Sequence, residues 1–138
     1  MGGGRGQVAI EYLFLMGFAL LLTLPLVIIY HTQSLRLSEE TAAAMVERAA
    51  GQIGAAADTV YYLGSPSVRT VTVQLPQNIK SVAFSGQSVI FTMDSSSGDY
   101  EHVAWSAANL TGSFTATQGP HVLMFSAMHN SWVNVTER

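Results

Sequence analysis

A long apolar run near the N-terminus most constrains what this chain can fold into. From Val8 to Tyr30 the sequence is VAIEYLFLMGFALLLTLPLVIIY, with a single charge at Glu11. As an α-helix rising about 1.5 Å per residue, the run is roughly 35 Å long, enough to cross a hydrocarbon core of about 30 Å. A helix in a soluble core rarely needs apolar residues on every face. The run therefore predicts a membrane-compatible helix.

The run does not have the form of a conventional cleaved secretory signal. The apolar region of such a signal is about 7–15 residues long and ends at a small-x-small site. This run is longer, and the polar His31-Thr32-Gln33-Ser34 follows it. N-myristoylation is also excluded, because Gly6 stands where that motif requires Ser or Thr.

Composition excludes several further classes of function. Charged residues make up 11% of the chain and the net charge is -3, so nucleic-acid binding has little electrostatic support. The absence of cysteine excludes disulfides, thiolate metal sites and a cysteine nucleophile. No P-loop, G-x-S-x-G, H-E-x-x-H or dinucleotide-binding pattern is present, and we expect neither an enzyme nor a cofactor.

Beyond the apolar run the periodicity changes twice. Spacings of three and four predict a helix with one alanine-rich face: Ala42, Val46, Ala49, Ile53, Ala56, Val60 and Leu63. Gly64-Ser65-Pro66 is a helix-stop signal. Runs rich in β-branched residues then predict strands at 68–75, 80–84, 88–93, 100–107, 112–117, 121–127 and 132–136. We expect an α+β fold, in which a long N-terminal hydrophobic helix continues into an antiparallel β-sheet head, a meander of about six strands.

Glu11 stands out within the apolar run. A lone carboxylate near the centre of a membrane helix costs about 2.5–3.5 kcal/mol and usually has a functional partner. Glu11 lies one turn from the start of the run, where the cost is smaller and where a carboxylate at the headgroup level is an alternative explanation.

The stretch Arg5-Gly6-Gln7-Val8-Ala9-Ile10-Glu11 resembles the processing region of archaeal type IV-like prepilins with a class III signal peptide. That pattern has a short leader ending in a charged residue and glycine, then Gln, then Glu four residues later inside a long apolar helix. The family often has Ser where this chain has Ala9. The helix followed by a β head extends the resemblance to the lollipop shape of pilins.

The resemblance implies a leader at 1–6, which a membrane-embedded prepilin peptidase removes by cutting between Gly6 and Gln7. It implies a helix at 7–64, whose residues 7–30 form the transmembrane or filament-core part and whose residues 31–64 pack on the head at 67–138. The implied partners are identical subunits, the membrane before assembly, and the membrane platform and ATPase of pilus assembly. The precursor would lie in the cytoplasmic membrane with its N-terminus inside, as the cation Arg5 also suggests, and the filament would be extracellular.

Cleavage would create an α-amino group on Gln7. Gln7 and Glu11 are separated by about 6 Å of helix rise, so the new ammonium and the Glu11 carboxylate of a subunit shifted along the axis are able to pair. Such a buried pair would fix the assembly register.

Weaker signals lie in the head. The histidines are dispersed, and the Asp94–Asp99 loop has too few ligands for a dedicated calcium site, so a polar hairpin turn is the better interpretation and no metal site is predicted. Asn109-Leu110-Thr111 and Asn134-Val135-Thr136 match the N-glycosylation pattern.

Three functions fit the sequence. The first is a structural pilus subunit that polymerises through its helix and displays the head for adhesion. The second is a minor pilin or pseudopilin of a secretion or substrate-binding assembly. The third is a binding module that keeps its N-terminal segment and stays anchored in the bilayer.

Overall fold

The computed structural model describes residues 3–138, with side chains from Gly6 onward. It confirms the α+β class, since one long N-terminal helix precedes two β-sheets that contact it. The chain divides into two compact units, one ending at Ser38 and the other running from Glu39 to Arg138. The elements are α1 (Gly3–Leu63), β1 (Val68–Leu75), β2 (Ile79–Ser85), β3 (Ser88–Met93), β4 (Tyr100–Trp105), β5 (Asn109–Ser113), β6 (Gly119–Ala127) and β7 (Trp132–Glu137).

The first unit consists of the N-terminal part of α1 alone. Its backbone is helical without a break through Gly17 and Pro25. Pro25 has no N–H to donate to the carbonyl one turn earlier. Two hydroxyls in this stretch donate to carbonyls of the preceding turn, Thr23 to Ala19 at 2.7 Å and Thr32 to Ile29 at 2.9 Å. Local hydrogen bonds therefore satisfy these polar groups inside an otherwise apolar helix.

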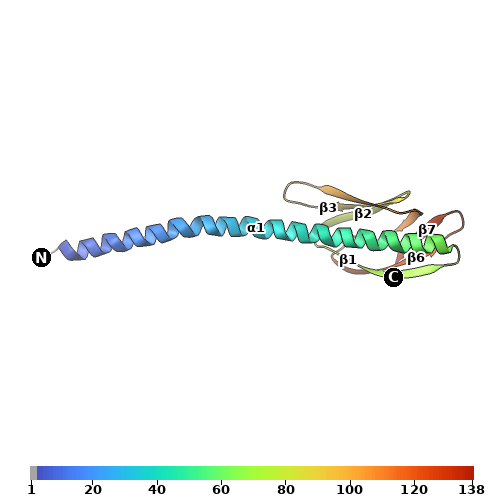
Figure 1. Cartoon of the computed structure of the whole chain (residues 1–138), viewed down its shortest axis with the longest axis horizontal. Coiled ribbons are helices and arrows are strands. Elements are labelled where there is room, and N and C mark those ends of the chain that lie inside the picture. The colour runs from blue at the N-terminus through green and yellow to red at the C-terminus, as the bar shows by residue number, and fades with distance from the viewer. Residues whose placement is uncertain (1–2) are drawn as a thin grey trace. The chain divides into compact units, whose positions relative to one another are not determined.

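In the second unit one side of α1 is buried against the sheets (Figure 1). The expected seam is confirmed from Ala42 to Val60, and its members are between 0% and 8% exposed. Ala50 and Ala57 widen the seam by adding a second row of small side chains. Leu63 was wrongly placed on it, because its side chain is 72% exposed at the last residue of the helix.

The predicted helix stop is confirmed at Gly64. This residue has φ of +73°, a left-handed conformation that glycine adopts without a Cβ penalty. Its N–H donates to Val60 O at 3.1 Å, and the Ser67 hydroxyl donates to the same carbonyl at 2.9 Å. These bonds satisfy an orphan carbonyl of the last turn and turn the chain directly into β1.

The strands form two sheets rather than one meander. Strands β2, β3 and β4 pair in sequence as two antiparallel hairpins, as expected. The other sheet has the order β1-β6-β7-β5, so β1 pairs with a strand that lies far along the chain. Figure 1 shows β1 beside the green part of α1 that precedes it. Alternation predicts which residues form strands, but it does not determine which strands pair.

The core lies between the inner faces of the two sheets and the buried side of α1. Its largest fully buried side chains are Phe91 of β3 and Phe125 of β6. From the helix, Val46, Ile53 and Val60 are each 0% exposed. Full burial of a side chain of this size contributes about 1.5–3 kcal/mol. These contacts make the second unit a folded domain with its own core.

Strand β5 differs most from expectation. The sequence predicted a strand at 112–117, whereas β5 is Asn109–Ser113 and pairs with β7 in parallel. Gly112 has φ of +122°, and a Cβ at this position would lie 1.9 Å from Val135 O. A glycine is therefore required for β5 to approach β7, and this close approach is what the strand prediction missed.

We expect Gly112→Ala to destabilise the head by more than about 4 kcal/mol, the range of exceptional substitutions. Gly119→Ala is a matched control, since Gly119 has nearly the same φ, +123°, but open space around its Cβ position. Backbone strain alone should cost the control about 1–3 kcal/mol. Denaturant unfolding of the full-length protein in detergent, followed by tryptophan fluorescence, measures both. Equal losses would show that the contact with Val135 is unimportant.

Candidate functional site

The first unit presents an exposed apolar surface over the residues that the structure describes. Its large side chains are more than half exposed all round the helix, for example Leu13 at 75%, Phe14 at 78% and Tyr30 at 77%. Among the described residues, α1 is the one helix long and apolar enough to cross a membrane. Exposing so much apolar area to water is strongly unfavourable. This helix fits membrane association or secretion.

Gln7 and Glu11, which the sequence analysis singled out, lie one turn apart on α1. The side-chain amide of Gln7 approaches a carboxylate oxygen of Glu11 at 3.4 Å, a long contact, and both residues are exposed. The Gly6–Gln7 bond lies within helical backbone, because α1 begins at Gly3. Met1 and Gly2 of the expected leader, and the side chain of Arg5, lie outside what the structure describes.

Two acidic residues of α1 hold loops of the head. Asp58 accepts hydrogen bonds from the Ser106 hydroxyl at 2.7 Å and from the Ala107 N–H at 2.8 Å. Glu39 accepts from the Ser95 hydroxyl at 3.2 Å and from the Ser96 N–H at 2.8 Å. The bonds from Ser96 hold the pKa of Glu39 below its ordinary value. Both acids lie off the predicted seam, and no local pattern distinguishes them from solvated charges.

A lysine side chain forms ion pairs with the acidic loop from Asp94 to Asp99. The ammonium of Lys80 on β2 contacts the carboxylates of both aspartates, at 3.5 Å from Asp94. Within residues 6–138 no group of three His, Cys, Asp or Glu side chains is placed to hold a metal ion. The contacts with Lys80 make the loop a polar turn closed by an exposed ion-pair network.

A buried histidine on β6 contacts the last residue of β7. His121 is 5% exposed, and its Nδ1 lies 2.6 Å from Glu137 Oε1 while its Nε2 lies 2.8 Å from Thr117 O. Since both neighbours are acceptors, the ring donates to both only when both nitrogens carry protons. Glu137 also accepts the Thr115 N–H at 3.0 Å. That bond first, and His121 second, hold the pKa of Glu137 below its ordinary value.

The outward side of the four-stranded sheet, which we call the outer face, carries no charged residue within its strands. Strand register and alternating burial assign its members: Val68, Thr70, Thr72 and Gln74 on β1; Pro120, Val122, Met124 and Ser126 on β6; Trp132, Asn134 and Thr136 on β7; and Asn109, Thr111 and Ser113 on β5. Both glycosylation patterns fall on this face. Asn134 is the register partner of Thr111, and Asn109 is the partner of Trp132.

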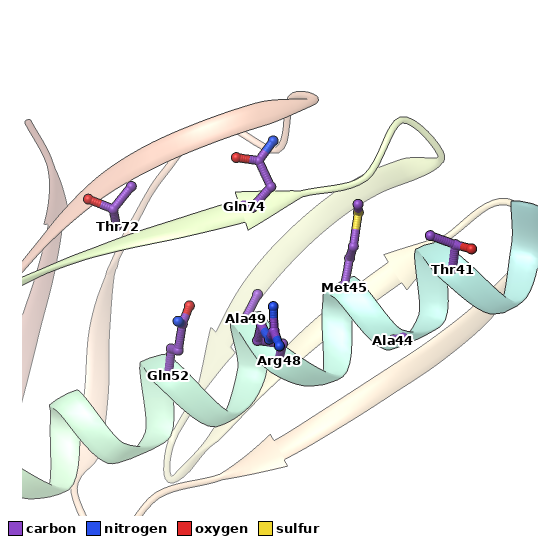
Figure 2. A pocket seen from close by; sticks show the side chains of 8 residues that line it. All are labelled: Thr41, Ala44, Met45, Arg48, Ala49, Gln52, Thr72 and Gln74. Atoms are coloured by element: carbon purple, nitrogen blue, oxygen red, sulfur yellow. The ribbon is translucent and has the colours of Figure 1, made fainter.

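An open groove of about 460 Å³ runs between α1 and the edge strand β1. Thr72 and Gln74, which belong to the outer face, form its strand wall (Figure 2). The helix wall consists of Thr41, Ala44, Met45, Arg48, Ala49 and Gln52. The groove is therefore continuous with the outer face, and the sequence analysis did not find it, because its two walls come from different elements.

Comparison with protein-family models, with curated proteins and with solved structures gives no match to this chain. The architecture itself is pilin-like: a long N-terminal apolar helix is packed in its later part against largely antiparallel sheets.

The two lowered carboxyl pKa values predict acid sensitivity of the head. A depressed pKa contributes stability that is present above the unfolded value, about 4.5, and is lost as the pH falls through the folded value. Glu137→Gln should therefore lower the melting temperature at pH 7. It should also reduce the fall in melting temperature between pH 7 and pH 3. Glu47→Gln, on an exposed side chain of α1, is the control. Thermal melts of the full-length protein test this, and an unchanged pH response in Glu137→Gln contradicts it.

Proposed function

We propose that this chain is the structural subunit of an extracellular type IV-like pilus. In this proposal it polymerises through its N-terminal helix after leader cleavage and displays its head for surface adhesion. The observation that carries the proposal is that residues 6–38 form an exposed apolar helix, while residues 39–138 form a separate unit with its own core. The head has buried its own core, so the remaining apolar surface is available for lipid or for other copies of the helix. The role proposed is structural rather than catalytic.

Glu11 favours assembly over permanent anchoring. In a bilayer its carboxylate would have no cationic partner, since no other charged side chain lies between Gly6 and Tyr30. In a bundle of processed helices the α-amino group of Gln7 supplies one. The cationic and anionic groups lie about 6 Å apart along each helix, so a shift of one turn between neighbours brings them together. Loss of one member of a buried pair typically costs about 3–5 kcal/mol.

Cleavage between Gly6 and Gln7 requires local unwinding, because both residues are helical here. Glycines at 3, 4 and 6 weaken the first turn, each by roughly 0.5–1 kcal/mol relative to alanine. A peptidase in the membrane is then able to hold this short segment in extended form. The same glycines would be unfavourable if the first turn had to remain helical in a packed assembly, which agrees with their removal.

The N-terminal residue of protein isolated from its natural source tests the processing step. We expect Gln7, free or cyclised to pyroglutamate, as the first residue by mass spectrometry of the N-terminal peptide. An intact N-terminal segment on protein that stays monomeric in the membrane would instead establish the anchored module.

Glu11→Ala tests the assembly step. The variant should be processed normally, since the Gly6–Gln7 bond is unchanged, but filament yield should fall at least tenfold because the neighbour's ammonium loses its partner. Glu47→Ala, which removes an exposed carboxylate from the head part of α1, should leave the yield unchanged. The measurement is sheared filament mass against total processed subunit. A normal yield from Glu11→Ala would exclude the pairing role.

A further inference from the structure

The chemistry of the outer face restricts what binds there. Its side chains are hydroxyls, amides and a few apolar groups, and none is charged. The charged residues of these four strands, Arg69 and Glu137, register with Phe125 and Leu123 and so belong to the opposite face. Arg138, which follows β7 and donates its backbone N–H to Val122 O at 2.9 Å, lies at the opposite end of β7 from Trp132. A charged ligand would therefore find no counter-ion in the strand residues around Trp132. The ligand that fits is uncharged and rich in hydrogen-bonding groups.

Nucleic acid, a membrane surface and a protein partner each fit the outer face poorly. Nucleic acid needs cations along its phosphates, and the face has none. A membrane surface needs a continuous apolar or basic face, whereas hydroxyl and amide groups interrupt this one. The cores of protein interfaces are depleted of Ser, and Ser and Thr seldom contribute much binding energy there. The hydroxyl-rich composition therefore favours a hydroxyl-rich partner.

The strand register arranges these groups in rows. Trp132 on β7, which is 41% exposed, stands beside Asn109 on β5, and the next outward row holds Asn134 and Thr111. Same-face neighbours are about 5 Å apart across strands and about 7 Å apart along a strand. An indole ring offers a flat apolar surface to the C–H face of a pyranose sugar. Adjacent amides and hydroxyls of the protein form hydrogen bonds with the hydroxyl groups of the sugar.

We propose that the outer face binds an uncharged polysaccharide, with Trp132 as the stacking platform and Asn109, Thr111 and Asn134 as the nearest hydrogen-bonding groups. The groove beside α1 borders the outer face at Thr72 and Gln74, where Arg48 on the helix wall supplies a charge, so the proposed site does not include the groove (Figure 2). The proposal names the ligand class for the adhesive role of the head and rests on that role. Binding by single subunits does not require polymerisation, so the two are tested separately.

The two glycosylation patterns have a simpler origin on this face. In a strand, Asn and the Thr two residues later point to the same side, so outward polar alternation produces N-x-T without further cause. Asn134 lies on a strand paired on both sides, and both asparagines are only partly exposed. In this proposal the two patterns are parts of a sugar-binding surface, and the N-glycosylation of Asn109 and Asn134 that the sequence predicts is the competing explanation.

The test is retention of full-length protein on polysaccharides. Protein made in a host without N-glycosylation, and kept in a zwitterionic detergent free of sugar, is incubated with cellulose, chitin and dextran beads, and with alginate as the acidic counterpart. Trp132→Ala should lower the affinity for a neutral polysaccharide about tenfold or more, as loss of an aromatic hot spot does. Trp105→Ala is the matched control, since Trp105 is 75% exposed on β4, outside the outer face. The affinity of the Trp105→Ala variant for the same polysaccharide should stay within about twofold of wild type.

A second variant covers the case in which Trp132→Ala does not fold, which circular dichroism and a thermal melt reveal. Thr111→Asp places a charge on the outer face of an edge strand and should reduce binding by a similar factor. Retention on alginate alone, retention on no polymer, or equal binding by the two tryptophan variants overturns the proposal. So does self-association of the wild type that Trp132→Ala abolishes in analytical ultracentrifugation, or sugar covalently attached to Asn109 or Asn134 in protein from its natural source.

Discussion

The apolar seam of α1 from Ala42 to Val60 is the contact on which the folded head depends. Each sheet has one apolar face, and neither face is shielded from water unless the helix and the other sheet cover it. The seam is rich in alanine, so helix and strand backbones approach closely. At Gly54 a Cβ would lie only 3.3 Å from Trp105 O. Small residues on the helix and large ones such as Phe91 and Phe125 on the sheets fill this layer.

The same helix has a different surface in the first unit. From Gly6 to Ser38 its described side chains are exposed, and most are apolar. In the second unit apolar residues are confined mainly to one side, and the remaining sides carry Glu40, Glu47 and Arg48. A helix that is apolar on every face needs a non-aqueous environment all round, whereas an amphipathic helix needs only one partner face. This contrast supports the proposal that the first unit enters lipid or packs with other copies of the helix, while the head remains in water.

Much of this could be predicted from the sequence because the signals are local. The strands β1 and β3 begin and end where alternation placed them, and Gly64 ends the helix because a left-handed residue there closes its last turn. The pairing of β1 with β6, the parallel pairing of β5 with β7 and the split into two sheets were not predictable in this way. They depend on which apolar faces meet around the helix, and no short window of sequence records that.

The sequence by itself determined the apolar rod, the position of Glu11 within it, and the change to strands after Gly64, because each follows from residue type and spacing along one stretch of chain. Only the tertiary structure decided that Asp58 and Glu39 hold loops of the head, and that His121 meets Glu137. It also decided that uncharged polar residues of four strands lie on one face. These groups are far apart in sequence, and it is strand pairing and register that bring their side chains within reach of one another.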